Sequence, residues 1–314
     1  MNNVKHPDSV APVWDAQRLS ARGTAAAQWF RSLQRTLCAT LEGEEPALRF
    51  ISDPWKRLEG GGGVTAVLQE GEVFEKAGIG FSEVFGRLSD HVAQSLAVPV
   101  QLFAATGISL IVHPRNPLVP TVHLNCRFFE MEDGTSWFGG GSDLTPSYID
   151  EEGFAHFHDI LKSVCERYER GSYEKFKEWA DRYFYLPHRQ EHRGIGGIFF
   201  DKLRDEPDKT FRFVQDLGNA FVESYLPIVI RRKGDSWGER ERKWQLLRRG
   251  RYVEFNLLHD RGTDFGLQSG GRVESVLMSL PPEVRWEYGA QPERGSREEA
   301  MVRLLKTPKS WASR

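Results

Sequence analysis

Three polar side chains alternate along one apolar stretch of the chain. His123, Asn125 and Arg127 are separated by single apolar residues within residues 121–129, which contain no glycine or proline. Such a stretch predicts a β-strand, whose successive side chains point to opposite faces, so the three polar groups share one face. An imidazole can transfer protons near neutral pH, and a guanidinium fork matches a carboxylate. The same pattern also fits a strand face that is only solvated.

A glycine-rich segment, WFGGGSDLTP at residues 137–146, follows this strand. Three glycines weaken a strand unless a second backbone or a ligand must approach closely. Asp143 ends the glycine run, and an ionised carboxylate only accepts hydrogen bonds, so it suits several converging N–H groups. A flexible turn fits the segment as well, with Asp143 as an Asx-turn or N-cap residue.

Composition and charge limit the class of protein. Hydrophobic residues make up 39% of the 314 residues, enough for a substantial core. The 42 basic and 44 acidic side chains give a net charge of −2, so there is no electrostatic case for nucleic acid or an anionic membrane. No apolar run approaches the ~20 residues that span a bilayer, so we expect no membrane span.

Cysteine usage and the N-terminal residues favour a cytoplasmic protein. The three cysteines form no CxxC pair, which favours a reduced compartment over a disulfide framework. Residues 1–23 lack the apolar segment of a secretory signal. We interpret them as a mobile N-terminal extension and residues 24–314 as a single domain.

Strand-like patterns precede residue 150 and return near the C-terminus. The early ones cover residues 50–57, 64–84, 98–113 and 121–129. The late ones, at residues 251–259, 273–280 and 285–288, lead us to expect three more strands. Within residues 98–113, Ser109, Ile111 and His113 fall on one face, where the two polar residues can join the polar face of the neighbouring strand.

Helical patterns lie mostly between these two groups of strands. Apolar residues at helical spacing mark residues 25–41, 154–168, 173–183 and 211–225, with a charged helix at 239–249 and a last helix at 298–305. We expect the fourth of these helices to end near Pro227. The order strands, helices, strands favours an α+β fold with a mostly antiparallel sheet.

Six further motifs follow in order along the chain. They are HPRNP at 113–117, YFYL at 183–186, RGIGG at 193–197, GRYVEFNL at 250–257, DRGT at 260–263 and MSLPP at 278–282. Together with residues 123–148, this ordered set resembles the oxygen-dependent coproporphyrinogen III oxidase family from about residue 27 to about residue 288. The resemblance implies a large, mostly antiparallel sheet flanked by helices on both faces.

The resemblance also implies a reaction. Members convert two propionates of coproporphyrinogen III to vinyl groups by oxidative decarboxylation, giving protoporphyrinogen IX in haem biosynthesis. Molecular O2 is the co-substrate and leaves as H2O2. The RGIGG motif lacks the G-x-G-x-x-G spacing of dinucleotide binding, so we expect no organic cofactor.

Matching positions give roles to individual residues. His123 matches the general acid/base of the family, and Asp143 matches its acceptor for pyrrole N–H groups. Substrate-binding positions match Ser109, Asn125, Cys126, Arg127, Arg261, Gly270, Gly271 and Arg272. Surface salt bridges and a hairpin loop fit the arginines and the glycine pair as well.

Four histidines match positions assigned as ligands of a divalent metal cation in bacterial members. They are His113, His123, His158 and His188. Imidazole is a common metal ligand. His158 shares a helical stripe with Phe154 and Leu161, so a hydrogen-bonded core histidine fits it too. The sequence alone does not require a metal.

The resemblance finally implies a homodimer built through residues 252–287. Two apolar strands expected at residues 253–258 and 276–280 would give a sheet edge that meets its own copy. Two other functions remain open: a His-ligated metal-dependent oxygenase or hydrolase, and a non-catalytic tetrapyrrole-binding protein.

Overall fold

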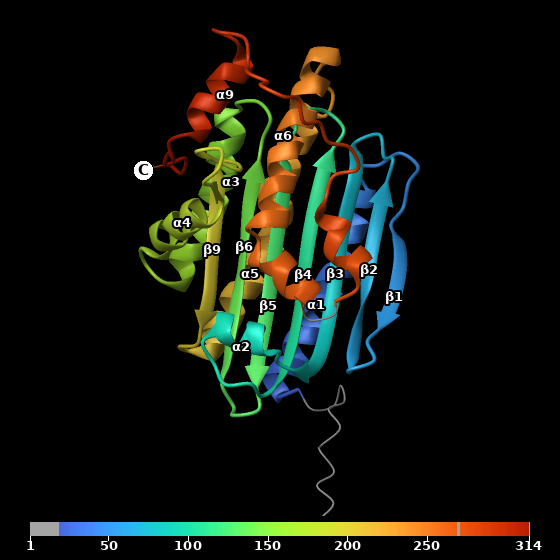
Figure 1. Ribbon diagram of the computed structural model, residues 1–314, viewed down its shortest axis with the longest axis vertical. Helices are drawn as coiled ribbons and strands as arrows, with labels where there is room; N and C mark the ends of the chain where they lie inside the picture. Colours follow the sequence, from blue (N-terminus) through green and yellow to red (C-terminus); the bar gives the residue numbers. More distant parts are fainter. Residues whose placement is uncertain (1–18, 269–270, 314) are drawn as a thin grey trace, which may run out of the picture.

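The computed structural model describes residues 19–268 and 271–313 (Figure 1). Residues 1–18, most of the predicted N-terminal extension, lie outside the described residues. Helix α1, Ala21–Glu42, begins within that predicted extension, and the hydroxyl of Ser20 caps it by accepting a hydrogen bond from the amide of Gly23. The described fold therefore starts a few residues before the predicted boundary.

One seven-stranded sheet forms the centre of the molecule, and every neighbouring pair in it is antiparallel. Its order is β1-β2-β3-β4-β5-β6-β9. The strands are β1 Ile51–Lys56, β2 Gly61–Gln69, β3 Phe74–Arg87, β4 Leu102–Pro114, β5 Thr121–Met131, β6 Ser136–Thr145 and β9 Gly196–Leu203. A separate small pair joins β7, Tyr185–Leu186, to β8, Glu191–His192. The strands predicted before residue 150 are confirmed, although residues 64–84 divide between β2 and β3.

Helices cover both faces of the sheet (Figure 1), as the predicted α+β class requires. The back face packs against α1, α3 Glu151–Tyr168 and α5 Pro207–Arg232, while α4 Ser172–Tyr183 packs beside β9. The front face is crossed by α2 Asp90–Leu96, α6 Glu239–Leu258, α7 Arg261–Gln268, α8 Val273–Val276 and the 3₁₀ turn η2 Leu277–Ser279. Helix α9, Arg297–Leu305, follows near the C-terminus. Among the described residues, no helix is long and apolar enough to cross a bilayer.

Strand β5 divides its side chains between the two faces as the alternation predicts. Val122, Leu124 and Cys126 are fully buried on the back face, where the Cys126 thiol lies 3.9 Å from the carbonyl oxygen of Val214 in α5. His123 and Asn125 point to the front face and stay partly exposed. The back face is therefore core, and the front face keeps its polar groups accessible.

None of the late segments is a strand, so the three strands expected there are wrong. Residues 251–258 continue α6, residues 273–279 form α8 and η2, and residues 285–288 form no strand. The sequence VEFNL alternates apolar and polar residues like a strand, but Tyr252, Phe255 and Asn256 are buried at helical spacing. Gly250 keeps α6 close to the following chain, since a Cβ there would lie 2.9 Å from the carbonyl oxygen of Arg285.

Helix α5 also differs from its prediction, because it runs through Pro227 to Arg232. Proline has no N–H, so it cannot donate to the carbonyl of Glu223 one turn earlier. The His156 imidazole donates to that carbonyl instead, at 2.8 Å. The proline is tolerated because a neighbouring helix satisfies the released acceptor.

Candidate active site

The front face of β2 to β5 carries small and polar side chains that remain partly exposed. We call this set the polar strip; it comprises Gly63, Gly80, Ser82, Gly107, Ser109, His123, Asn125 and Arg127. Its members lie side by side on adjacent strands, since the strand register pairs Gly80 with Ser109 and Ser109 with Asn125. No member on β2, β3 or β4 is larger than serine. The strip therefore offers a surface of short side chains, which Met278 contacts at Gly80 and the Trp55 ring contacts at Gly63.

The glycine run lies in strand β6, so the flexible-turn alternative is wrong. A Cβ on Gly140 would lie 2.5 Å from the carbonyl oxygen of Asn125, and one on Gly141 would lie 2.4 Å from that of Ile198. The close backbone approach that three glycines require is thus present on both sides of β6. Gly139 makes room for a different contact, since its Cβ would lie 2.5 Å from Asp201 Oδ1.

His123 and Asp143 face each other across β5 and β6 and form a hydrogen-bonded pair. Nδ1 of His123 lies 3.0 Å from Oδ1 of Asp143, and the side chains are 26% and 3% exposed. Because an ionised carboxylate only accepts, Nδ1 carries the proton, and Nε2 is left for a ligand. Asp143 lies inside a strand, so it is neither an Asx-turn nor an N-cap residue. The pair has the arrangement of a general acid/base held by a carboxylate.

Arg193, in the bend between β8 and β9, contacts the second oxygen of the Asp143 carboxylate. Its guanidinium donates to Oδ2 of Asp143 and, at 3.1 Å, to Oδ1 of Asn256 in α6. Burial alone would raise the pKa of Asp143, but the charge of Arg193 and the hydrogen bond from His123 outweigh it, so this pKa lies below its usual value. The Asp143 carboxylate consequently stays ionised at neutral pH. In the sequence, Arg193 stands out only as part of the RGIGG motif, which indicates no role for it.

Two side-chain oxygens fix the position of the Arg127 guanidinium on the polar strip. Its guanidinium donates to Oδ1 of Asn125 and to Oδ1 of Asp201, both at 2.9 Å, and it lies 5.9 Å from the centre of the Phe199 ring. The side chain is still 34% exposed. A ligand carboxylate at this place would compete with Asp201 for the Arg127 guanidinium. No sequence motif indicated this role for Asp201.

Arg261 lies on the same side of the sheet as Arg127. Its backbone amide donates to the Tyr183 hydroxyl at 3.1 Å, and that hydroxyl donates to Asp260 at 2.7 Å. The Tyr183 ring stacks on Phe199 at 4.3 Å between centres. Phe199 therefore connects both arginines, since Arg127 lies over its ring.

Arg272 lies far from these two arginines. It pairs with Asp53 of β1 at 2.5 Å and with Glu274 at 3.5 Å. Register places Asp53 in one row with Asn125 but four strands away, roughly 19 Å at the usual strand spacing. The structure does not bring Arg272 to the Arg127 end of the strip.

The remaining predicted substrate contacts are divided between several places. Ser109 lies on the polar strip, whereas the Cys126 side chain lies on the back face. Gly270 lies outside the described residues. Gly271 follows helix α7 instead of the expected strand and turn, and its amide donates to the carbonyl of Gly266 at 2.8 Å.

The four histidines proposed as metal ligands do not meet. His113 is buried, with Nε2 2.8 Å from the carbonyl oxygen of Ser279. His158 is buried with Nδ1 2.8 Å from the Tyr173 hydroxyl, so it is the core histidine. His188 lies at an exposed site, 2.8 Å from Glu254. In the part of the chain that the structure describes, no group of three His, Cys, Asp or Glu side chains can hold a metal ion. These residues do not fit a four-histidine centre.

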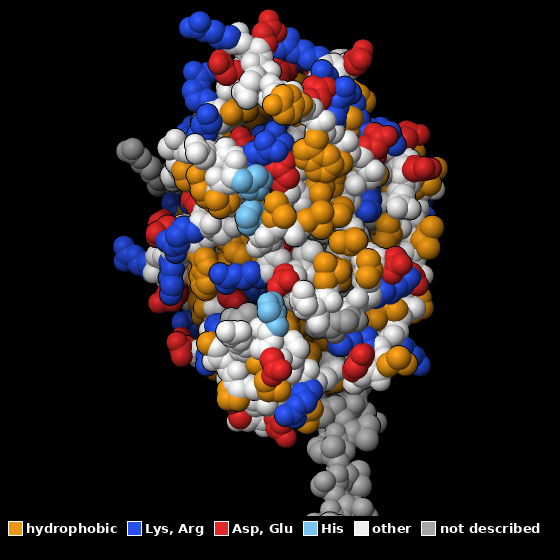
Figure 2. Space-filling model, in the orientation of Figure 1, with side chains coloured by type: hydrophobic (Ala, Val, Ile, Leu, Met, Phe, Trp, Pro, Cys, Tyr) orange, Lys and Arg blue, Asp and Glu red, His pale blue; other side chains and the backbone are white. Residues whose placement is uncertain are grey.

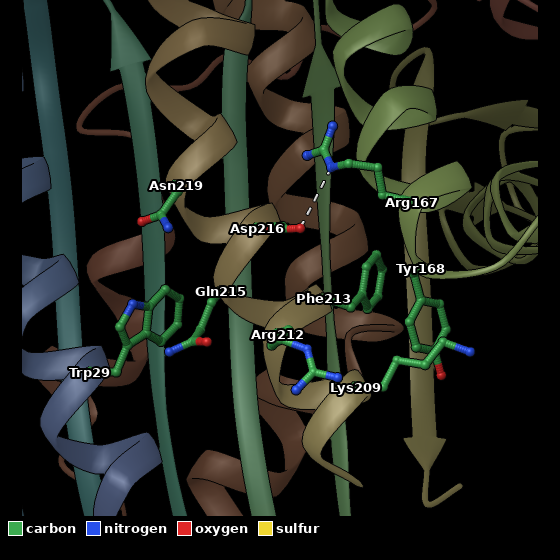
Figure 3. A pocket seen from close by; sticks show the side chains of 9 residues that line it. All are labelled: Trp29, Arg167, Tyr168, Lys209, Arg212, Phe213, Gln215, Asp216 and Asn219. Atoms are coloured by element: carbon green, nitrogen blue, oxygen red, sulfur yellow. Dashed lines mark ion pairs between the residues drawn. The ribbon is translucent and has the colours of Figure 1, made fainter. Parts of the chain in front are cut away.

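A hollow lies on the opposite side of the molecule from these residues. It has a volume of about 360 Å³ and lies over α5, between Trp29 of α1 and Tyr168 of α3 (Figure 3). Arg167 at its rim points to Asp216 and pairs with it at 3.6 Å, and Lys209 pairs with Glu206 at 2.8 Å. The sheet separates this hollow from the polar strip, so it takes no part in the site.

A model of the coproporphyrinogen III oxidase family matches residues 25–311 of the chain. The match begins in α1 and ends beyond α9, so it includes every residue of the polar strip. It also includes the His123–Asp143 pair, Arg193 and both arginines near Phe199.

Proposed function

The chain belongs to the coproporphyrinogen III oxidase family, and we propose that it uses O2 to convert coproporphyrinogen III to protoporphyrinogen IX. Membership places it in haem biosynthesis as an oxidative decarboxylase. The observation that carries the proposal for this site is the polar strip, which contains the His123 of the His123–Asp143 pair and ends at Arg127, with Arg261 near that end.

The substrate's chemistry matches this arrangement part by part. A tetrapyrrole is broad and carries carboxylates at its edge. Its site therefore needs a surface of short side chains, with cationic groups at the rim. The strip supplies this surface. Arg127 and Arg261 supply planar forks that match carboxylates. Ser109 and Asn125 add short-range hydrogen-bonding groups on the strip.

The proposed reaction balances with O2 as the only oxidant. For each propionate, the bond to the carboxylate carbon breaks and releases CO2, while the carbon next to the pyrrole loses one hydrogen. The two electrons and this hydrogen go to O2, which takes up one further proton and leaves as H2O2. The protein positions the propionate, shields it from water and moves the proton.

His123 is the group that we assign to proton transfer. Asp143 holds its Nδ1, so Nε2 is the nitrogen that exchanges a proton with substrate or oxygen species. Both oxygens of Asp143 already accept hydrogen bonds from His123 and Arg193. Asp143 therefore acts mainly through His123, and direct acceptance from pyrrole N–H groups would require it to share these oxygens. The proton transfer is assigned to the imidazole of His123 and to no metal, because the four histidines do not form one centre among the described residues.

Incubation with coproporphyrinogen III, in air and under an inert gas, tests the proposal. No cofactor is added, and products are identified by chromatography and mass spectrometry. We expect vinyl product and H2O2 in air only. Equal turnover without O2 would refute the oxygen-dependent mechanism. Tight binding without vinyl product would instead indicate a carrier, and loss of activity with a chelator would indicate a metal-dependent enzyme.

We further propose a homodimer through residues 252–287. This segment exposes large apolar side chains: Leu257, Leu258, Leu267, Val273 and Trp286. Figure 2 shows hydrophobic side chains gathered on this face, where α6 and the chain after α8 lie in Figure 1. The contacts would be made by helices and loops and not by the strand edge that the sequence suggested. Sedimentation at micromolar concentration tests this, and a fully active monomer would contradict it.

The cysteines support the proposed cytoplasmic location. Cys38, Cys126 and Cys165 are all free thiols, and two of them are buried. Free thiols persist in reducing compartments, where disulfides are rare. Fractionation of cells that express the tagged chain would test the location directly.

A further inference from the structure

Arg193 is a buried cation that contacts the Asp143 carboxylate on the oxygen not used by His123. Its side chain and that of Asp143 are each only 3% exposed. The charge is surrounded by the rings of Phe184, Tyr252 and Phe255, whose centres lie 4.2, 4.7 and 4.7 Å from its guanidinium carbon. Cation–π contacts of this kind offset part of the cost of burial.

Such a pair is a poor device for stability alone. Removing two charges from water costs several kcal/mol per ion, and well-packed apolar residues often do as well. The fold nevertheless brings together three distant parts of the chain here: Asp143 on β6, Arg193 before β9 and Asn256 on α6. A role in geometry accounts for this arrangement better than a role in stability.

The contacts form a relay from the core to the polar strip. Arg193 donates a hydrogen bond from Nη1 to Oδ1 of Asn256 and one from Nη2 to Oδ2 of Asp143, and Oδ1 of Asp143 accepts from Nδ1 of His123. The guanidinium is planar, so fixing two of its nitrogens fixes the orientation of the carboxylate it binds. The orientation of the carboxylate then decides which imidazole nitrogen carries the proton.

We infer that Arg193 is a positioning residue: its ion pair holds Asp143 against His123 and so fixes Nε2 as the imidazole nitrogen that faces the reacting groups. Arg193 is enclosed between β6 and α6, makes no contact with His123, and acts only through Asp143. The expected effect of Arg193 on kcat rests on the proposed function, whereas its expected effect on the His123 tautomer does not.

Arg193→Lys is the first test variant. Lysine keeps the charge but is a point donor that cannot hold Asn256 and Asp143 in one plane. We expect kcat to fall by about 10–100-fold while KM changes by less than about twofold, because misplacement of a catalytic group by about 1 Å costs that much. We also expect the ¹⁵N spectrum of His123 to change from one protonated ring nitrogen to a mixture of two tautomers.

Arg248→Lys is the matched control. Arg248 pairs with Glu191 at 2.7 Å, and the two side chains are 5% and 7% exposed, so it is an equally buried ion pair away from the strip. We expect this variant to lose a comparable amount of stability but to keep kcat and the His123 tautomer. An equal loss of kcat in both variants would show that Arg193 is structural only.

The tautomer readout separates this inference from the proposed reaction. The chain has nine histidines, so His123→Gln is used to assign the His123 signals. If no vinyl product forms with wild-type protein but Arg193→Lys still mixes the tautomers, the proposed reaction fails and the positioning role stands. If Arg193→Lys leaves the tautomer and kcat unchanged, the positioning role is overturned.

Arg193→Ala with added guanidinium gives a second arm. Removal of the side chain leaves Asp143 uncompensated, and soluble guanidinium restores the missing fork. We expect partial recovery of kcat, and recovery with sodium chloride at the same ionic strength would contradict the inference. If the alanine variant does not fold, the lysine variant alone decides.

Discussion

The two faces of the central sheet share their backbone but differ in almost every physical property. On the back face, Leu110, Leu124 and Cys126 are each fully buried against α1 and α5. On the front face, next to them in sequence, Ser109, His123 and Asn125 stay partly exposed. The difference teaches that one strand can anchor the fold with one set of side chains and present chemistry with the other.

Two histidines show the same contrast in electrostatic terms. His158, behind the sheet, is fully enclosed, and its burial, with a smaller contribution from Lys177, lowers its pKa to about 3. It is therefore neutral at physiological pH and serves as a hydrogen-bond partner of Tyr173. His123, on the front face, keeps 26% of its side chain exposed and is paired to a carboxylate. Only the second environment suits reversible proton transfer.

The largest expected effect on the front face is that of His123→Gln. Glutamine keeps the approximate size and a hydrogen-bonding tip but cannot act as an acid or base near neutral pH. We expect kcat/KM to fall by about 10²–10⁴-fold, the usual contribution of a general acid/base. Thermal unfolding should change little, because the side chain is partly exposed. Near-normal turnover in a folded variant would mean that another group moves the proton.

The adjacent residue on the back face should behave in the opposite way. Leu124→Ala removes buried methyl groups and leaves a cavity, so the free energy of unfolding should fall by about 2–5 kcal/mol. Its folded fraction should keep wild-type kcat and KM, measured well below the melting temperature. A large loss of kcat in folded Leu124→Ala would show that the two faces are not independent.

Local periodicity predicted the parts of the site that one strand carries. The alternation of residues 121–129 assigned His123, Asn125 and Arg127 to one face correctly, and the glycine run correctly indicated a close backbone approach. Both features depend on neighbours along the chain or on an adjacent strand, which a pattern of period two can reveal.

Tertiary contacts could not be predicted in this way. Arg193 lies 50 residues from Asp143 and 63 from Asn256, and only the fold brings them together. The buried charge in the RGIGG motif was the available signal, because an arginine among glycines and apolar residues needs a partner. The segment at 251–258 misled for a related reason: its alternation fits a strand, but helix α6 continues into it.

The third prediction concerns the pH dependence of stability and uses the back-face histidine. The folded pKa of His158 is about 3, compared with 6.5 for an ordinary histidine. In the unfolded chain the imidazole binds a proton below pH 6.5, while in the folded chain it does not. The His158 contribution to stability is thus complete above pH 6.5 and is lost as pH falls towards 3, by up to about 1.4 kcal/mol per pH unit.

His158→Phe should remove the His158 contribution to the pH dependence of the free energy of unfolding. The variant is less stable at pH 7, because it leaves the Tyr173 hydroxyl without its partner. Between pH 6 and pH 4 its free energy of unfolding, measured with urea, should fall less steeply than that of the wild type. The difference in slope should correspond to about one proton fewer taken up on unfolding. Identical slopes would show that His158 is protonated in the folded protein. His113 is also buried with a lowered pKa, so part of the slope should remain.

The smallest effect should come from one methyl group on the polar strip. A Cβ on Gly80 would lie 2.9 Å from the terminal methyl carbon of Met278, the far end of a flexible side chain, so Gly80→Ala should fold. Gly80 lies in one row with Ser109, and a methyl group there would push the Met278 side chain towards the space that a ligand on the strip would occupy. We expect KM for coproporphyrinogen III to rise several-fold, which corresponds to about 1 kcal/mol, while kcat changes less. Gly86→Ala is the matched control, because Gly86 lies on the same face of β3 but outside the strip, and its Cβ would meet only Phe103 at an ordinary 3.5 Å. Since neither glycine has a positive φ, both alanines are compatible with the strand. An equal rise in KM for both variants would mean that the substrate does not rest on the polar strip.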